Sequence, residues 1–374
     1  MDFNYSDEQK LLIDSVERFI QDDYGFDTRR AILKSEDGFR RDLWQKFGEL
    51  GWLAVPFSEE DGGLGGTAVE TMIIMECFGR GLVVEPYLST VVLAGGLLRL
   101  GGNAGQKETI LPELMAGTLL AAVGYAEPTS RFNLADVSTT AEKTSGGWVL
   151  KGRKSVVLHG PMADKLIVSA RTSGGQRDQA GITLFVIDAG AAGVSRQDYP
   201  TVDGLRASEI ILDGVAVGEA DVVGAVGEGF ALLDRVIDEA TAAICAEAVG
   251  AMETLHKATL EYARTRVQFG QPIGRFQVIQ HRLVDMYMAY EQAKSMAIMA
   301  NLKLDAAPEE RRRAVSAAKV QIGKSARFIG QQAVQLHGGM GMTDELNVGH
   351  YFKRLTMIET MFGNTDFHLK RYAA

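Results

Sequence analysis

The sequence predicts an α+β protein in which a helical segment, a β-rich segment and a second helical segment follow one another. Apolar residues recur at helical spacing up to about residue 118, alternate with polar residues up to about residue 218, and return to helical spacing beyond it. A chain of 374 residues is also too long for one small core. We therefore expect an N-terminal helical domain at residues 1–118, a middle β domain at 119–218 and a C-terminal helical domain at 219–374.

The N-terminal segment begins with the start signal of a helix. Ser6 and Gln9 stand at the spacing of a capping box, in which each side chain bonds the other residue's backbone N–H. Leu12, Val16 and Ile20 follow at helical intervals. Further amphipathic stretches lie at residues 39–55, 67–82 and, more briefly, within 105–124.

The middle segment has the two-residue period of half-buried strands. Residues 139–160 are typical of a strand, a Ser-Gly-Gly turn and a second strand, and β-rich runs follow at 163–172, 181–190 and 208–217. Short strands in series without intervening helices favour an antiparallel barrel or sandwich over a βαβ sheet.

The C-terminal segment predicts an antiparallel four-helix bundle. Long helical patterns at 276–304 and 309–339 carry Met, Ala and Gly stripes, which are typical of bundle helices. The first helix of this segment has one apolar stripe, formed by Phe230, Leu233, Val236, Ile237, Ala240 and Ile244.

Composition excludes several classes of function. A formal charge of -9 and a pI near 5.3 argue against a nucleic-acid partner, because phosphate binding requires a basic surface. The apolar run at 91–102 is too short and too rich in glycine to span a membrane. The acidic start has no signal or transit character, so we expect a cytoplasmic protein. The six histidines and two cysteines show no metal-ligand spacing, so we expect no metal site.

Two motifs remain that could carry chemistry. Residues 262–277, "YARTRVQFGQPIGRFQ", predict a helix–loop–helix whose arginines are either simply solvated or, in the case of Arg266, bind a phosphate beside Phe269 and Gln277. Residues 335–342, "QLHGGMGM", are either a glycine helix cap or a backbone that approaches a pyrophosphate. Because this glycine run follows a helix and not a strand, it is not a Rossmann fingerprint.

The order of segments, together with "PFSEEDGGLGG" at 56–66 and the two motifs above, resembles the acyl-CoA dehydrogenase family over nearly the whole chain. The resemblance implies a FAD enzyme that removes the α-proton of an acyl-CoA thioester and transfers the β-hydrogen as hydride to the flavin. It also implies an electron-transfer flavoprotein as the electron acceptor. In this family FAD is shared between two subunits, and one subunit's C-terminal helices contact the adenosine and pyrophosphate of its neighbour's FAD. The matching neighbour-side residues are Arg266, Phe269, Gln277, Gln335, Gly338 and Gly339.

The flavin-side motifs of the family are altered in this sequence. The run "AEPTSRFNLAD" keeps Glu127, Pro128 and Asp136, but a Gly-Ser step is replaced by Leu134 and Ala135. In "SVVLHG", at 155–160, the aromatic residue expected to pack on the flavin and the threonine expected to bond it are both absent. The resemblance therefore implies weaker binding of a flavin ring in this chain's own middle domain.

The positions of the family's catalytic base are also altered. The usual glutamate near the C-terminus corresponds to Phe362, and the alternative position, ten residues before Gly250, corresponds to Ala240. Glu239 could serve only if the helix held a bulge, since one residue rotates the side chain by about 100°. Glu247 could serve as a base or could be a buried structural glutamate. The catalytic residue is therefore left unassigned.

Intact neighbour-side motifs beside altered flavin-side motifs resemble the small subunits of two-component, α2β2 acyl-CoA dehydrogenases, such as those acting on pimeloyl-CoA or on steroid side chains. The resemblance implies a larger partner subunit that carries the base. Two alternatives remain open at this stage: a self-sufficient homo-oligomeric dehydrogenase with a displaced base, and a flavin-free protein that binds acyl-CoA or has a structural role.

Overall fold

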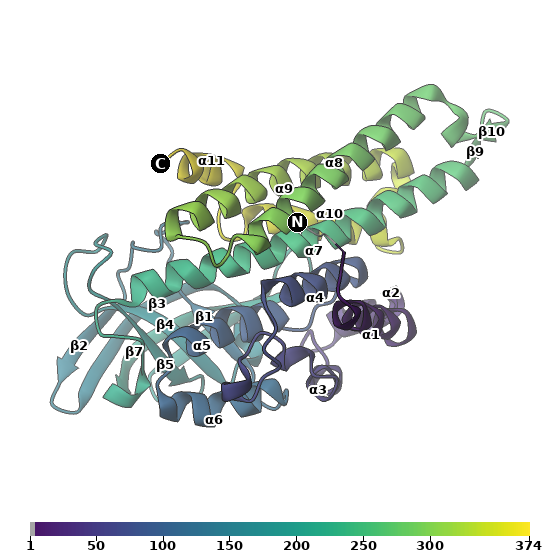
Figure 1. The fold of residues 1–374 in the computed structure, drawn as a ribbon. Helices are drawn as coiled ribbons and strands as arrows, with labels where there is room; N and C mark the ends of the chain where they lie inside the picture. The colour runs from purple at the N-terminus through teal and green to yellow at the C-terminus, as the bar shows by residue number, and fades with distance from the viewer. Residues whose placement is uncertain (1–3) are drawn as a thin grey trace. The chain divides into compact units, whose positions relative to one another are not determined.

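The computed structural model describes residues 4–374 and confirms the α+β prediction. The chain forms two compact units (Figure 1). The first comprises the chain up to Ala31, residues 68–83 and residues 241–374. The second comprises residues 32–67 and 84–240.

The first unit is helical. The predicted capping box is present, because Gln9 N donates to Ser6 Oγ over 3.2 Å and Ser6 N donates to Gln9 Oε1 over 3.0 Å. The helices of this unit are α1 (Asp7–Asp23), the first part of α2 (Phe26–Lys34), α4 (Ala68–Gly81), α7 (Gly229–Thr265) from Thr241 onward, α8 (Gln277–Leu302), α9 (Pro308–His337), α10 (Asn347–Thr360) and α11 (Thr365–Ala373).

Helix α8 runs antiparallel to its neighbours α7 and α9, as predicted for a bundle (Figure 1). Asn301 Nδ2 donates to Ala242 O over 3.4 Å, and His256 Nε2 lies 3.2 Å from Leu283 O, so α8 runs back along α7. Helix α9 in turn runs back along α8, because Ser325 Oγ donates to Ala289 O over 2.9 Å.

Helices α4 and α7 cross at two glycines. A Cβ on Gly79 would lie 1.9 Å from Glu247 O, and a Cβ on Gly250 would lie 1.8 Å from Glu76 O. Real Cβ atoms do not approach oxygen so closely, so the two backbones can touch only because both positions lack a side chain.

The second unit contains an eight-stranded sheet in the order β6-β7-β3-β2-β4-β5-β8, with β1 paired to β4. The sheet is mainly antiparallel, as predicted, but β1 runs parallel to β4, and β2 meets β4 in a short parallel pairing. Its strands are β1 (Ala121–Gly124), β2 (Thr140–Thr144), β3 (Gly147–Leu158), β4 (Lys165–Arg171), β5 (Ile182–Asp188), β6 (Val194–Pro200), β7 (Arg206–Val217) and β8 (Val222–Val223).

The second unit also contains helices. They are α3 (Arg41–Glu49), α5 (Gly96–Gly101), α6 (Ala104–Met115) and η3 (Leu88–Gly95). The η3 segment is a π-helix buried along its whole length, and Thr90 Oγ1 on it donates to Ala121 O of β1 over 3.0 Å. A helix buried on all sides has no polar face, so its sequence shows no helical period.

In the part of the chain that the structure describes, we find no helix with the length and apolar character needed to cross a membrane.

The glycine crossing predicts a stability effect. Gly250→Ala should lower the free energy of unfolding by about 1–3 kcal/mol or more, because the new methyl group forces α4 and α7 apart. Gly25→Ala is the matched control, since its Cβ would meet nothing within 4 Å. Denaturant unfolding measures both variants, and equal stability of the two would contradict the prediction.

Candidate functional site

The first nucleotide motif forms the exposed tip that follows α7. Arg266 comes directly after the helix, and the chain turns back through β9 (Val267–Gln268) and β10 (Gln271–Pro272), held by a 2.8 Å hydrogen bond from Ile273 N to Arg266 O. Phe269 lies in the turn with a φ of 54° and is 91% exposed. Its ring lies edge-on to Phe276, with centroids 6.1 Å apart. Gln277 opens α8 and is also exposed.

The second motif forms the end of α9. Gly338 has a φ of 61° and its N–H donates to Gln335 O, which ends the helix. A Cβ on Gly338 or on Gly339 would meet nothing within 4 Å, so the backbone faces open space at both residues. A ligand could therefore approach the backbone closely at these two glycines.

The structure brings the two motifs together at the same end of the helical unit. Tyr262, in the last turn of α7, stacks on His337, the last residue of α9, with ring centroids 4.3 Å apart and ring planes 28° apart. Sequence reasoning did not assign a role to either residue. The available signal was that Tyr262 precedes Arg266 by one helical turn and that His337 lies inside the glycine motif.

The side chains at this end are open and cationic. Arg266, Gln277 and Gln335 are exposed, and within residues 4–374 no side-chain hydrogen bond or ion pair occupies them. Arg275 is likewise exposed and unpaired in that part of the chain, whereas Arg264 lies 4.0 Å from Glu261. The site thus presents positive charge and backbone donors, a combination suited to phosphate groups.

The retained part of the flavin-side motif is a buried polar network. Lys154 Nζ lies 2.6 Å from Glu127 Oε1, and both side chains are almost fully buried. Glu127 also accepts hydrogen bonds from Ser138 N over 2.8 Å and from Thr139 N over 3.1 Å. Burial alone would raise the pKa of Glu127, but Lys154 and these donors lower it to about 2. The network joins the loop at 127–139 to strand β3.

The altered part of the flavin-side motif, at residues 155–160, lies at a β-bulge in β3. Val156 has a φ of 52° and is 50% exposed, and its N–H donates to Glu209 Oε1 over 3.2 Å. The same carboxylate accepts hydrogen bonds from Ser155 Oγ over 2.8 Å, from Tyr199 OH over 3.1 Å and from Arg153 Nε over 3.0 Å. The chain's own polar groups thus surround the bulge.

A buried histidine directly follows strand β3. His159 follows Leu158, has a φ of 56°, and is buried, with Nδ1 2.9 Å from Ser89 Oγ on η3. The sequence indicated only that the expected aromatic residue and threonine are absent here, and the buried Ser89–His159 contact is an addition from the structure.

Phe362 lies in the turn between α10 and α11 and is buried, with a φ of 55°. Lys319 Nζ, itself buried, donates to Gly363 O over 2.6 Å and to Glu359 O over 2.9 Å. His368 Nε2 lies 3.1 Å from Phe362 O. Buried donors from α9 and α11 therefore hold a left-handed conformation that a non-glycine residue rarely adopts.

Glu247 is paired with an arginine. Arg354, on α10, reaches both oxygens of the carboxylate, with a distance of 2.7 Å from Nη2 to Oε2. Both side chains are buried. This bidentate pair engages both carboxylate oxygens of Glu247.

Ala240 and Glu239 belong to the other unit. Ala240 is fully buried. Glu239 accepts hydrogen bonds from Arg99 Nη2 over 2.7 Å and from Arg235 Nε over 2.8 Å. Helix α7 is α-helical along its whole length, without the bulge that would bring Glu239 into the place of Ala240.

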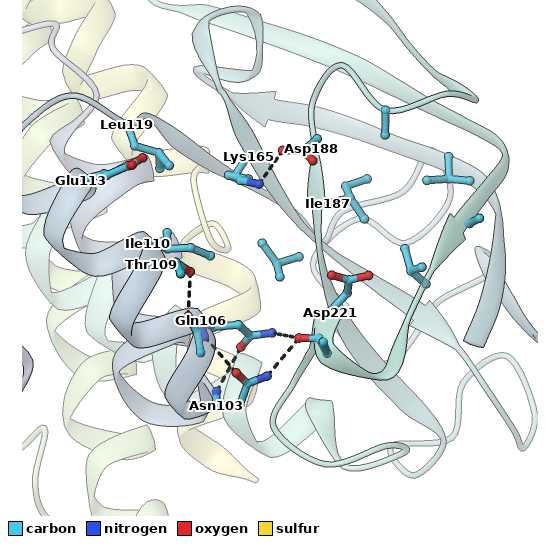
Figure 2. Close-up of a pocket in the computed structure, with 17 residues that line it drawn as sticks. Asn103, Gln106, Thr109, Ile110, Glu113, Leu119, Lys165, Ile187, Asp188 and Asp221 are labelled. Atoms are coloured by element: carbon cyan, nitrogen blue, oxygen red, sulfur yellow. Dashed lines mark hydrogen bonds and ion pairs between the residues drawn. The ribbon is translucent and has the colours of Figure 1, made fainter. Parts of the chain in front are cut away.

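A cavity of about 500 Å³ lies between α6 and strands β4, β5 and β7 (Figure 2). It contains none of the predicted site residues. Its charged side chains are the carboxylates of Glu113, Asp188 and Asp221 and the ammonium of Lys165, which pairs with Asp188. This acidic lining does not suit a phosphate group.

Comparison with known proteins identifies the class. Residues 6–118, 122–215 and 227–374 match the N-terminal, middle and C-terminal domains of acyl-CoA dehydrogenases. The chain belongs to the acyl-CoA dehydrogenase family, whose members among its relatives are named as dehydrogenases or reductases.

Three similar proteins show how close the similarity is. The "Probable acyl-CoA dehydrogenase YngJ" of Bacillus subtilis (strain 168) is 30% identical over 98% of this chain and 97% of its own. The structure of "PigA with FAD and proline" has a TM-score of 0.92 and 27% identity over 100% of this chain and 98% of its own. The ChsE4-ChsE5 complex from Mycobacterium tuberculosis has a TM-score of 0.90 and 26% identity over the same shares.

The turn at Phe362 predicts an acid-dependent loss of stability. Burial, with Lys319 and Arg371 nearby, lowers the pKa of His368 to about 3. Between pH 6.5 and pH 3 the unfolded chain binds a proton at this residue that the folded chain does not, so stability falls as pH falls. His368→Asn should reduce the slope of stability against pH by about 1.4 kcal/mol per pH unit.

Denaturant unfolding at pH 5.0–6.5, where most carboxylates stay ionised, measures this slope. His281→Asn on the exposed surface of α8 is the control, and equal slopes for the wild type and His368→Asn would refute the assignment.

Proposed function

We propose that this chain is the small subunit of a heteromeric acyl-CoA dehydrogenase, which oxidises the α,β-bond of an acyl-CoA thioester with FAD. In this proposal the chain completes the FAD site of a larger subunit and lacks a catalytic base of its own. The observation that carries the proposal is a contrast. The nucleotide end is open and cationic, whereas the ring side has lost its aromatic and hydroxyl side chains and the two usual base positions are apolar.

The nucleotide end of FAD fits the residues present. Arg266 offers an unpaired guanidinium to a phosphate, and Gly338 and Gly339 offer unobstructed backbone. Phe269, 91% exposed, offers an apolar face at the same end. Gln277 and Gln335 offer amide groups to polar atoms of the nucleotide. These side chains are exposed in one chain, which suits a site completed by another chain.

The ring side fits FAD poorly. At the bulge in β3 the exposed side chain is Val156, which cannot stack on an isoalloxazine ring. Leu158 has no hydroxyl to bond a flavin atom. Tight binding of a flavin ring by this chain's own middle domain is therefore not expected.

Proton abstraction at C2 of a thioester needs a carboxylate with an available lone pair near the substrate. Phe362 and Ala240 have none. Both oxygens of Glu247 are bound by Arg354, and Glu239 is bound by two arginines. We infer that the partner subunit supplies the base, while FAD, when bound, supplies the hydride acceptor.

Similarity to the ChsE4-ChsE5 complex supports a heteromeric assembly for this chain. Within such assemblies we favour an α2β2 tetramer acting on a dicarboxylic thioester of the pimeloyl-CoA type, in the cytoplasm, with an electron-transfer flavoprotein as acceptor. We also propose that the boundaries between the three domains lie after residues 118 and 218.

The first prediction concerns the isolated chain. Purified alone, it should contain less than stoichiometric FAD and should not reduce an acceptor dye with any acyl-CoA. Co-expressed with a longer acyl-CoA dehydrogenase chain that keeps the catalytic glutamate, it should form a yellow, active complex. Turnover by the chain alone, abolished by Glu239→Gln, would establish the self-sufficient enzyme in its place, and absence of FAD from every assembly would establish the flavin-free protein.

The second prediction concerns the phosphate contact. In the complex, Arg266→Ala should weaken FAD binding by roughly 10- to 100-fold, because a charge-assisted contact contributes about 1.5–3 kcal/mol. Arg264→Ala removes an equally exposed arginine two residues away that lies near Glu261, and it should leave the affinity almost unchanged. Fluorescence titration of the deflavinated complex with FAD measures both, and similar dissociation constants would exclude Arg266 from the site.

A further inference from the structure

We propose that Tyr262 and His337 are positioning residues, which brace the two nucleotide motifs against each other so that the FAD-binding end is formed before FAD arrives. This inference rests on the proposed function. It goes beyond it by assigning a role to two side chains that do not contact the phosphate.

The stack is short and well defined. The ring centroids of Tyr262 and His337 are 4.3 Å apart, with the ring planes 28° apart. Tyr262 OH also donates to His337 O over 3.5 Å. His337 is 4% exposed, and its Nδ1 lies 2.8 Å from Ala333 O one turn back in α9, so the ring cannot rotate freely.

Each ring is joined directly to a nucleotide-binding residue. On α7, Arg266 N donates to Tyr262 O over 2.8 Å, and Arg266 O in turn accepts from Ile273 N over 2.8 Å. On α9, Gly338 follows His337, and a Cβ on Gly341 would lie 3.1 Å from His337 Cβ, so the glycine loop folds back onto the same residue. The brace therefore lies between the phosphate-binding arginine and the glycine backbone.

A second contact restrains the third helix. Arg282 Nη1, on α8, donates to Gln332 Oε1 of α9 over 2.8 Å, five residues before His337. With α8 tied to α9 there, the Tyr262–His337 stack adds a direct contact between the ends of α7 and α9. Preorganisation of this kind raises affinity by removing the ordering cost at binding.

The test is a double-mutant cycle on FAD affinity in the assembly that carries FAD. Tyr262→Leu removes the stacked ring and should weaken FAD binding by at least tenfold. Tyr262→Phe keeps the ring and should stay within about threefold of the wild type. If the brace positions Arg266, then Arg266→Ala should cost clearly less in the Tyr262→Leu background than in the wild type.

Tyr24→Leu is the folding control. Tyr24 is a buried ring of the same unit that packs on Phe19, with centroids 6.2 Å apart, and is not part of either motif. It should lower the melting temperature and leave the dissociation constant of FAD unchanged. A purely structural role for Tyr262 would give the same pattern for Tyr262→Leu.

The outcomes separate the two claims. Absence of FAD from the wild-type assembly would overturn the proposed function and the brace together. Weakened binding in Arg266→Ala, with unchanged binding in Tyr262→Leu or with strictly multiplicative losses in the double variant, would overturn the brace alone.

Discussion

The pairing of buried carboxylates with arginines is the constraint on which the proposed division of labour depends. A buried carboxylate needs a cation or several donors, and one that has them is a poor proton acceptor for a substrate. Glu247 is bound by Arg354, and Glu239 is bound by Arg99 and Arg235. Glu359, on the helix before Phe362, accepts from Thr365 N over 3.1 Å. These three carboxylates are thus engaged by groups of the chain itself.

The same constraint explains why the nucleotide end is different. There Arg266 and Arg275 are exposed and have no side-chain partner within the described chain, which costs little in water. In the proposed function a polyphosphate would neutralise these cations. One region of the protein has therefore satisfied its charges internally, while the other leaves these two arginines exposed.

The broad fold was predictable from the sequence, because periodicity reports which faces are buried. The long helices α8 and α9 and the hairpin of β2 and β3 lie where the pattern placed them. Strand β6 was missed because its residues are largely exposed and polar, and π-helix η3 because all its faces are buried. The two motifs were proposed as nucleotide-binding through family resemblance, and that role stays a prediction. The Tyr262–His337 stack could not be read from the sequence, because it is a tertiary contact between residues 75 positions apart.

The apolar side chains exposed at and near the hairpin tip bear on how long an unassembled copy persists in a cell. Phe269, Val267, Val278 and Met342 are each more than half exposed. In the proposed heteromer, a copy that lacks its companion subunit would therefore expose apolar surface to other macromolecules. Such orphan copies are the ones that chaperones and proteases meet and remove. Synthesis in excess of the companion would then yield no surplus protein, and cellular abundance would be matched to that of the companion through turnover.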